Sequence, residues 1–250
     1  MKPGEIGACG PAVAAAFDGA ADSYDRLVAV NPGYHRHLRS SARRMCLPEA
    51  GSGLRLLDAG CGTGASTAAL LAVHPHAEIV AVDASAEMLA RARRKSWPES
   101  VRFVHAPVES LAEAGVRGPF DGIFAAYLIR NLVDPDARLR ALRALLRPGG
   151  ALGVHEYSVR DSPLARATWH AVCCGVIIPA GWAATGDASL FRYLRRSVAA
   201  FDGVSRFRRR LGEAGFTAVR SATMTGWQRR IVHTFVAERP AEPGRGPDER

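Results

Sequence analysis

Lysine is almost absent from this chain: of its 33 basic residues only Lys2 and Lys95 are lysine, and the rest are arginine. The formal net charge of +9 would by itself suggest nucleic acid or an anionic membrane as partner. The arginines are dispersed, however, and no basic run is interleaved with aromatic residues, as a single-strand binder requires. We therefore predict no nucleic-acid partner and attribute the charge to a general arginine bias.

Metal-type cysteine pairs and long apolar runs are also lacking. The chain has five cysteines with no CxxC pair, and only Cys173 and Cys174 lie close together. This pattern predicts neither a zinc site nor a disulfide framework and favours a reducing, cytoplasmic compartment. The N-terminus has no continuous apolar core of the kind found in signal peptides. The longest apolar stretch, 171–184, contains two glycines and a proline and is too short to cross a bilayer.

The middle of the chain alternates short apolar runs with helical patterns. A length of 250 residues, 48% hydrophobic and 23% charged, supports one sizeable α/β domain. Buried strands are predicted at 54–58, 78–83, 101–105, 120–126 and 152–157, with helices at 66–73, 86–95, 108–114 and 136–146, the last stopped by Pro148-Gly149-Gly150. This alternation implies a parallel sheet with helices on both faces.

The alternation breaks after the fifth strand. Residues 160–200 carry helical patterns without a strand, and a helix at 205–214 then precedes strands at 218–225 and 231–238. We predict a main domain at 47–239 in which 160–200 is a lid over the carboxyl edge of the sheet, where open α/β sheets bind ligands. Residues 1–46 are predicted to be a helical cap over the same edge, and the polar tail 240–250 to be disordered.

The strongest motif runs from Asp58 to Gly64, where a strand ends and a helix begins. Its three glycines let the backbone turn sharply and approach a ligand. The spacing is GxGxG rather than the GxGxxG of dinucleotide sites, and an acid two residues before the first glycine suits an ammonium group better than a pyrophosphate. Asp83 ends the next strand, 19 residues after Gly64, where an acid can accept hydrogen bonds from both ribose hydroxyls.

Together these residues resemble motifs of the class I S-adenosylmethionine (SAM) methyltransferases, over residues 54–150. The resemblance implies a Rossmann-like fold with a seven-stranded, mostly parallel sheet, and SAM as cofactor. It implies cofactor contacts from Tyr24, Asp58, Gly60, Cys61, Gly62, Thr63, Gly64, Asp83, Ala84, Met88, Pro107, Val108 and Ala126. The acid that such enzymes usually carry after the third strand is missing between His105 and Glu109, so Pro107 and Val108 are expected to contact the adenine. Cys61 has no neighbouring base in sequence and is interpreted as a small packing residue.

A narrower resemblance begins at the fourth strand. The segment from Phe120 to Leu132, with Arg130-Asn131 near its end, resembles the UbiE/COQ5 family of ubiquinone and menaquinone C-methyltransferases. Further matches lie at Tyr24-Asp25, at 155–158 and at 191–197. Leu38 and Phe191 depart from the tryptophan and tyrosine that the family carries there, which leaves the exact methyl acceptor open.

The resemblance implies methyl transfer from SAM to a ring carbon of a (poly)prenylated quinol such as demethylmenaquinol. The ring becomes nucleophilic once a hydroxyl, with a pKa of about 10 like that of tyrosine, is deprotonated. We assign stabilisation of this phenolate to Arg130, whose guanidinium stays protonated, and substrate orientation to Asn131. Substrate contacts are expected from His35, Arg36, Tyr127, His155, Tyr157 and Tyr193.

Two other functions remain open at this point. One is O- or C-methylation of a soluble aromatic secondary metabolite, which a short closed pocket would favour. The other is ligand binding by a SAM-type fold without methyl transfer, which the missing adenine-site acid keeps open. The apolar segment from Trp169 to Trp182 would line a tunnel for a prenyl tail or form plain lid core. The sequence also allows weak contact with anionic lipid and a homodimer through the C-terminal strands or the lid.

Overall fold

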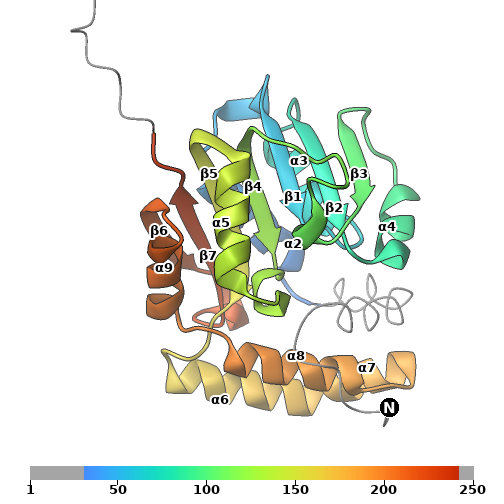
Figure 1. Cartoon of the computed structure of the whole chain (residues 1–250). Helices are drawn as coiled ribbons and strands as arrows, with labels where there is room; N and C mark the ends of the chain where they lie inside the picture. Colours follow the sequence, from blue (N-terminus) through green and yellow to red (C-terminus); the bar gives the residue numbers. More distant parts are fainter. Residues whose placement is uncertain (1–30, 242–250) are drawn as a thin grey trace, which may run out of the picture.

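The computed structural model describes residues 31–241, which form a single seven-stranded sheet with helices around it (Figure 1). The strand order is β3-β2-β1-β4-β5-β7-β6. The parallel strands are β1 (Arg55–Ala59), β2 (Glu78–Asp83), β3 (Val101–His105), β4 (Phe120–Ala126) and β5 (Leu146–Tyr157). β7 (Val232–Glu238) runs antiparallel between β5 and β6 (Thr217–Thr223). The predicted Rossmann-like α/β class is confirmed.

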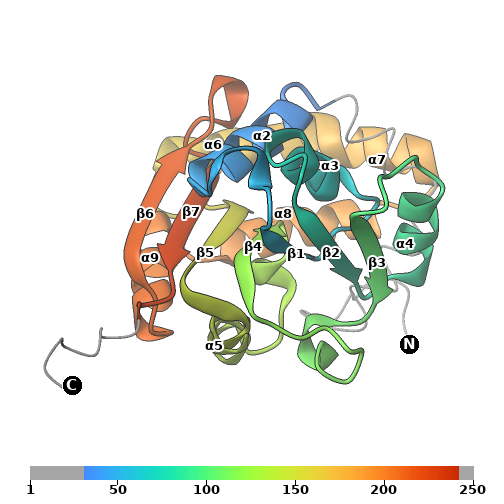
Figure 2. The same ribbon diagram turned by 90° about the horizontal axis from the view of Figure 1, so that it is seen from above.

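Helices cover both faces of the sheet, because successive strand residues point to opposite sides and most of them are apolar. On one face lie α2 (Tyr34–Arg44), α3 (Ala65–Val73) and α4 (Ala86–Arg93), and on the other lie α5 (Pro135–Leu145) and α9 (Val204–Glu213) (Figure 2). Thus Leu56 and Phe124 pack toward α2 and α3, whereas Leu57 and Ile123 pack toward α5 and α9. Single turns of 3₁₀ helix lie at Glu49–Gly51, Val108–Ser110, Ile129–Asn131 and Gly226–Gln228.

A helical layer crosses the carboxyl ends of the parallel strands, where the sequence predicts a lid (Figure 1). It consists of α6 (Pro163–Val172), a π-helical turn (Cys173–Ile177), α7 (Ile178–Thr185) and α8 (Ser189–Ala200). α6 to α7 is one continuous helix of 23 residues. Its most apolar 18-residue window has a mean hydropathy of 1.3, and 17% of that window is buried. By length and composition alone this helix could cross a membrane, which corrects the expectation drawn from the shorter stretch 171–184.

Of the predicted N-terminal cap at 1–46, the structure describes residues 31–46, and this part differs from the predicted position over the carboxyl edge. The part of it that the structure describes, α2, packs on the face of the sheet beside α3, with Leu38 and Ala42 fully buried. Only the first turn of α2 reaches the carboxyl edge, where the Tyr34 ring stacks on Tyr127 at a centroid distance of 6.0 Å. The apolar stripe of α2 explains this position, since it needs a broad apolar surface rather than an edge.

Two local predictions are also wrong. β5 begins at Leu146, and Pro148-Gly149-Gly150 lies inside the strand instead of ending the preceding helix, which already stops at Leu145. Gly149 has φ +73°, and a Cβ on Gly150 would lie 3.1 Å from the Phe120 carbonyl oxygen. The glycines therefore let β5 continue close alongside β4. The helix predicted at 108–114 is reduced to the 3₁₀ turn Val108–Ser110.

Candidate active site

The glycine loop between β1 and α3 leaves open space at one position. Gly62 has φ +54°, and a Cβ there would meet nothing within 4 Å. In contrast, a Cβ on Gly60 would lie 3.0 Å from the Leu128 side chain, and one on Gly64 would lie 2.7 Å from the Trp97 ring. Close packing thus explains the outer two glycines, while the space beside Gly62 is compatible with the predicted close approach of a ligand.

The Asp83 carboxylate joins this loop to the end of β2. One oxygen accepts the Gly62 backbone N–H at 2.7 Å and the other accepts the Ser85 N–H at 2.9 Å. Ser85 in turn caps α4 by accepting the Met88 N–H at 3.1 Å. Each carboxylate oxygen has a second lone pair, so the predicted contact with ribose hydroxyls is compatible with these hydrogen bonds.

Asp58 is a fully buried acid at the end of β1. Its Oδ2 accepts from the Ser66 hydroxyl at 2.8 Å and from the Thr67 hydroxyl at 2.6 Å, whereas Oδ1 has no partner among the described residues. Burial, and secondarily the Asp83 charge, raise the pKa of Asp58 to about 7. A buried acid with one oxygen unsatisfied fits the ammonium group of SAM, because a nearby cation stabilises the carboxylate.

The remaining predicted cofactor residues follow the same edge of the sheet. Lys95 donates to the Thr63 carbonyl at 2.8 Å, and His105 bonds the Ala84 carbonyl at 3.0 Å. Burial raises the pKa of the Cys61 thiol well above its usual range, in keeping with a packing role. Met88 and Val108 are buried, Ala126 is half-buried, and Ala84 and Pro107 are exposed. Tyr24 lies outside the described residues.

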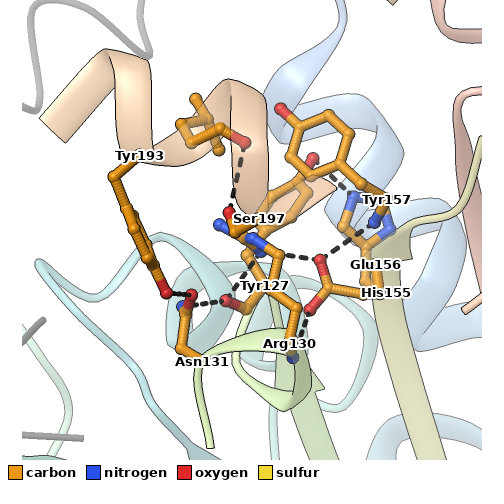
Figure 3. A network of polar contacts seen from close by, with 9 residues as sticks. Tyr127, Arg130, Asn131, His155, Glu156, Tyr157, Tyr193 and Ser197 are labelled. Atoms are coloured by element: carbon orange, nitrogen blue, oxygen red, sulfur yellow. Dashed lines mark hydrogen bonds and ion pairs between the residues drawn. The ribbon is translucent and has the colours of Figure 1, made fainter. Parts of the chain in front are cut away.

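A buried ion pair stands at the carboxyl ends of β4 and β5 (Figure 3). Arg130 Nη1 donates to Glu156 Oε1 at 2.6 Å and to the Tyr127 carbonyl at 2.9 Å, and the two side chains are 4% and 0% exposed. Burial, the largest single cause, acts to lower the pKa of Arg130, but the charge of Glu156, its hydrogen bond with Arg130 and the nearby Tyr157 and Tyr193 together outweigh it, and the pKa is raised. Arg130 Nε has no partner among the described residues. Much of the positive charge of Arg130 is thus balanced by Glu156 within the protein.

Glu156 lies within the 155–158 match, but the sequence motifs do not reveal that it is the partner of Arg130. It also accepts the Tyr157 backbone N–H at 2.9 Å and the Arg130 N–H at 3.4 Å. The available signal was an acid at the end of an otherwise apolar strand, since such an acid needs a buried partner. Its partner could not be named before β4 and β5 were known to be neighbours, with Ala126 opposite His155.

A row of aromatic rings lies beside this ion pair. Tyr127 packs against Tyr157 at a centroid distance of 4.8 Å, and Tyr157 packs against Trp169 of the lid at 4.7 Å. Tyr34 stacks on the other face of Tyr127. The Arg130 Cζ lies 5.7 and 5.4 Å from the Tyr127 and Tyr157 ring centroids, within cation–π range. The row joins α2, β4, β5 and α6.

Two predicted site residues connect the lid to the turn that carries Arg130. The Tyr193 hydroxyl, on α8, donates to Asn131 Oδ1 at 2.9 Å, and Asn131 Nδ2 donates to the Tyr127 carbonyl at 3.0 Å (Figure 3). His155 lies next to them and is fully buried, with Nε2 at 2.9 Å from the Tyr127 hydroxyl and Nδ1 at 2.7 Å from Ser41 Oγ. Burial chiefly lowers the pKa of His155 to about 3.

His35 and Arg36 do not join the cluster. Both are exposed on α2, while the buried neighbours Tyr34 and His37 face the sheet. His37 Nδ1 lies 2.6 Å from Gln228 Oε1. The helical period explains why Tyr34 and His37 are buried while their neighbours are exposed, because positions 34, 37, 38 and 41 share one face of α2.

Comparison with protein families and curated proteins gives a consistent result. Residues 7–234 match the model of the ubiE/COQ5 methyltransferase family. A demethylmenaquinone methyltransferase of Clavibacter sepedonicus is 32% identical over 226 residues, covering 90% of this chain and 87% of the relative. The ubiquinone/menaquinone biosynthesis C-methyltransferase UbiE of Syntrophotalea carbinolica is 35% identical over 213 residues, covering 84% and 88%.

Solved structures show the same fold at lower identity. The [4+2]-cyclase SpnF superposes with a TM-score of 0.68 at 17% identity, covering 97% of this chain and all of that one. A SAM-dependent methyltransferase of Thermotoga maritima, described as a possible histamine N-methyltransferase, gives a TM-score of 0.64 at 18% identity, with coverages of 91% and 99%. These similarities concern the fold, since the two proteins carry names of different reactions. The family match over most of the sequence decides the assignment: the chain belongs to the ubiE/COQ5 methyltransferase family, with S-adenosylmethionine as its cofactor.

Proposed function

We propose that this methyltransferase transfers a methyl group to a ring carbon of a prenylated quinol of the demethylmenaquinol type. The observation that carries the proposal is the position of the aromatic row and Arg130 next to the glycine loop. The turn from Tyr127 to Arg130 contacts that loop, since Leu128 fills the space in front of Gly60. The names of the relatives from Clavibacter sepedonicus and Syntrophotalea carbinolica support the same acceptor class.

Bound SAM supplies an electrophilic methyl group, and the residues of this chain supply its placement and the acceptor's activation. Asp58 would hold the ammonium group of the cofactor, and Asp83 fixes the glycine loop by accepting the Gly62 N–H. Beyond them, the rings of Tyr157 and Trp169 provide apolar surface that excludes water.

Activation of the acceptor falls to Arg130 and Asn131 in this proposal. The hydrogen bonds that Arg130 donates to described residues come from Nη1, so the other N–H groups of the guanidinium are left to donate to the phenolate oxygen. Glu156 holds the guanidinium in place while Arg130 donates to the phenolate oxygen. Asn131 orients the ring, and Tyr193 couples that orientation to the position of the lid.

Label transfer tests this function. The purified protein is incubated with methyl-labelled SAM and a demethylmenaquinone, once chemically reduced and once oxidised. We expect label in the reduced acceptor only, because the oxidised ring has no ionisable hydroxyl to make it nucleophilic. Binding of SAM with no label in any reduced quinone would overturn the proposal.

The length of the acceptor separates a quinol from a soluble aromatic metabolite. Trp169 lies in the lid core against Tyr157, whereas Trp182 is exposed, so the two tryptophans do not line one shared tunnel. We therefore expect the lid to receive a prenyl tail along its outer side. Reduced acceptors with no tail, a short tail and a long tail are compared by kcat/KM. A value highest without a tail would favour the soluble metabolite.

We further propose that the lid rests on an anionic membrane from the cytoplasmic side. Leu164 is 71% and Trp182 is 61% exposed on the long helix, and no acid interrupts the sequence between Asp161 and Asp187. Exposed apolar residues on a basic protein suit shallow insertion among negatively charged headgroups. The homodimer that the sequence allows remains a prediction, with the edge strand β6 as its open border.

Vesicle sedimentation tests the membrane proposal. The protein is mixed with vesicles of phosphatidylglycerol and phosphatidylcholine, or of phosphatidylcholine alone. We expect binding to the anionic vesicles that weakens in high salt and is lost in Leu164→Glu/Trp182→Glu. A matched control, Val133→Glu, changes another exposed apolar residue that lies in the segment before α5 rather than on the long helix. Equal binding by the lid variant and the wild type would contradict the proposal.

A further inference from the structure

A groove lies between the start of α6 and the turn that joins β6 to β7, at the edge of the sheet where the lid crosses (Figures 1 and 2). Its volume is about 300 Å³. Both elements contribute to its apolar lining, which includes Leu164, Ala165, Trp227 and Ile231. Arg229 and Arg230, which follow the turn, also line it. The groove is therefore apolar along its length and basic on one side.

The charge of the two arginines is not balanced within the described part of the chain. No ion pair within residues 31–241 includes Arg229 or Arg230, and no acid among these residues lines the groove. Asp161 lines a neighbouring cavity instead, where its Oδ2 accepts the Ser205 N–H at 2.9 Å. The groove thus offers two guanidinium groups to an anion.

The turn is a fixed support for these arginines. Arg230 has φ +63°, in the left-handed region that residues other than glycine rarely adopt. Its backbone N–H donates to Thr223 Oγ1 at 2.6 Å, and the Ile231 N–H donates to the Gln228 carbonyl at 2.9 Å. Gln228 is fully buried, with Oε1 at 2.6 Å from His37 Nδ1. Strained backbone that its surroundings hold in this way is typical of positions that bind ligands.

The lining favours a phospholipid as occupant. Arginine binds phosphate oxygens through paired N–H donors, and the apolar lining suits hydrocarbon, whereas a prenyl tail has no charge for the arginines. Leu164, which is 71% exposed, belongs both to the groove and to the lid surface that we propose to meet the membrane. Because about 300 Å³ is the lower end of the range for ligand pockets, the groove holds the headgroup and the first chain carbons rather than a whole lipid.

Resting on the membrane contact proposed above, we infer that this groove binds the phosphate of an anionic phospholipid. Arg229 and Arg230 hold the phosphate, and Leu164 lies beside the acyl chains. A lipid held there anchors the start of α6, and the exposed Trp182, further along the same continuous helix, contacts the membrane at a second point. Two points of contact orient the long helix along the membrane surface.

Vesicle binding tests the two arginines against a matched pair. Arg229→Gln/Arg230→Gln and Arg102→Gln/Arg209→Gln remove the same charge, and Arg102 and Arg209 are exposed residues of β3 and α9 outside the groove. We expect the first variant to bind vesicles of phosphatidylglycerol and phosphatidylcholine about tenfold to a hundredfold more weakly than the wild type, the range for hydrogen bonds to a charged group. The second should lose less than about threefold, because screening weakens charges that lie beyond a Debye length from the lipid. Equal losses in the two variants would overturn the inference in favour of general charge attraction.

A soluble lipid separates the groove from surface charge and from free phosphate. Calorimetry measures binding of dihexanoyl phosphatidylglycerol, below its micelle concentration, and of inorganic phosphate. We expect one-to-one binding of the lipid and binding of phosphate that is weaker by about tenfold or more, because phosphate leaves the apolar lining in water. Thr168→Phe places a ring in the groove and should abolish lipid binding, whereas Ala167→Phe changes an exposed neighbour outside it and should not. Phosphate bound as tightly as the lipid, or lipid binding retained in Thr168→Phe, would contradict a lipid site.

The outcomes separate this inference from the proposed function. If the wild type binds anionic vesicles and Arg229→Gln/Arg230→Gln binds them equally well, the inference is wrong and the membrane proposal stands. If the wild type binds no vesicles yet binds the soluble lipid through the two arginines, the membrane proposal is wrong and the site stands. Label transfer to a short-tailed reduced quinone without vesicles should be the same in the wild type and this variant. A large loss there would place the arginines in the methyl-transfer site and overturn the inference.

Discussion

Two carboxylates, Asp58 on β1 and Glu156 on β5, are both fully buried at the same edge of the sheet and yet have opposite surroundings. Asp58 accepts only from the neutral hydroxyls of Ser66 and Thr67, and one of its oxygens has no partner among the described residues. Glu156 accepts from a guanidinium and from two backbone N–H groups. Among the described residues none places a cation beside Asp58, whereas Arg130 supplies one beside Glu156.

This difference divides the candidate active site into two halves. We call Asp58 with the glycine loop the responsive half, and the Arg130–Glu156 pair with the turn from Tyr127 to Asn131 the fixed half. Burial makes the charged form of Asp58 unfavourable until a cation lies beside it. We therefore expect the carboxylate to pair with the ammonium group of the cofactor. The charge of Glu156 is stabilised by Arg130 within the fold, and the pair holds the turn from Tyr127 to Asn131 against β5. Buried charges of the second kind are costly to separate.

Breaking the fixed half should have the largest effect. Arg130→Met leaves the Glu156 charge buried without its cation, and we expect the free energy of unfolding to fall by about 3–5 kcal/mol. The double variant Arg130→Met/Glu156→Gln should regain part of this loss, because no charge is then left unpaired. Denaturant titration of both variants measures the difference. Equal losses in the two variants would show that packing, not charge, explains the stability.

Turnover and SAM affinity of the double variant give a second test. In Arg130→Met/Glu156→Gln we expect turnover to collapse while the affinity for SAM stays close to that of the wild type, since Arg130 lies on the acceptor side of the glycine loop. A loss of SAM affinity as large as the loss of turnover would contradict the division into two halves.

Changing the responsive half should have a smaller effect, and on binding rather than folding. Asp58→Asn keeps an amide oxygen for the Ser66 and Thr67 hydroxyls but removes the charge. We expect SAM affinity to fall about tenfold to a hundredfold, which corresponds to about 1.5–3 kcal/mol for a hydrogen bond with a charged group. Calorimetric titration with SAM measures it.

Asp121→Asn is the matched control for Asp58→Asn, because Asp121 is an acid of β4 that pairs with the half-exposed Arg147 outside the site. It should leave SAM affinity unchanged. If Asp58→Asn also bound SAM as tightly as the wild type, Asp58 would not be the partner of the ammonium group.

The responsive half could be predicted from sequence and the fixed half only in part. Asp58, Gly62 and Asp83 lie in one motif and at the next strand end, so local spacing places them together. Most strands and helices could be predicted too, because hydrophobic periodicity is also a local pattern. Two segments are exceptions. The helix predicted at 108–114 is only the 3₁₀ turn Val108–Ser110. The Pro-Gly-Gly segment, which was expected to end a helix, instead continues β5 through close packing with β4.

The fixed half depends on contacts between distant residues. Arg130 and Glu156 are 26 positions apart, and Ser41 and His155 are 114 apart. The motif matches contain Arg130 and Asn131 and also their partners Glu156 and Tyr193, but they do not show which residues pair. The pairing becomes visible only through the register of β4 with β5 and the positions of α2 and α8. The exposure of His35 and Arg36 was within reach of sequence reasoning, since the apolar stripe of α2 already places them outside.

The smallest expected difference between the two carboxylates is in the number of protons released when SAM binds. The pKa of Asp58 is raised from 3.8 to about 7, so this group stabilises the unliganded fold at low pH, and the contribution is lost as pH rises through about 7. A cation beside it reverses the preference, so SAM binding should release a proton below neutral pH. Apparent affinity should then rise with pH by at most about tenfold per unit, or about 1.4 kcal/mol, and level off above about 7, before the ligand's own amino group titrates near 8. Titration calorimetry in buffers of different ionisation enthalpy counts the proton. Asp58→Asn should release none and Arg130→Met/Glu156→Gln should release as many as the wild type, because only the half without a resident cation has a proton to lose.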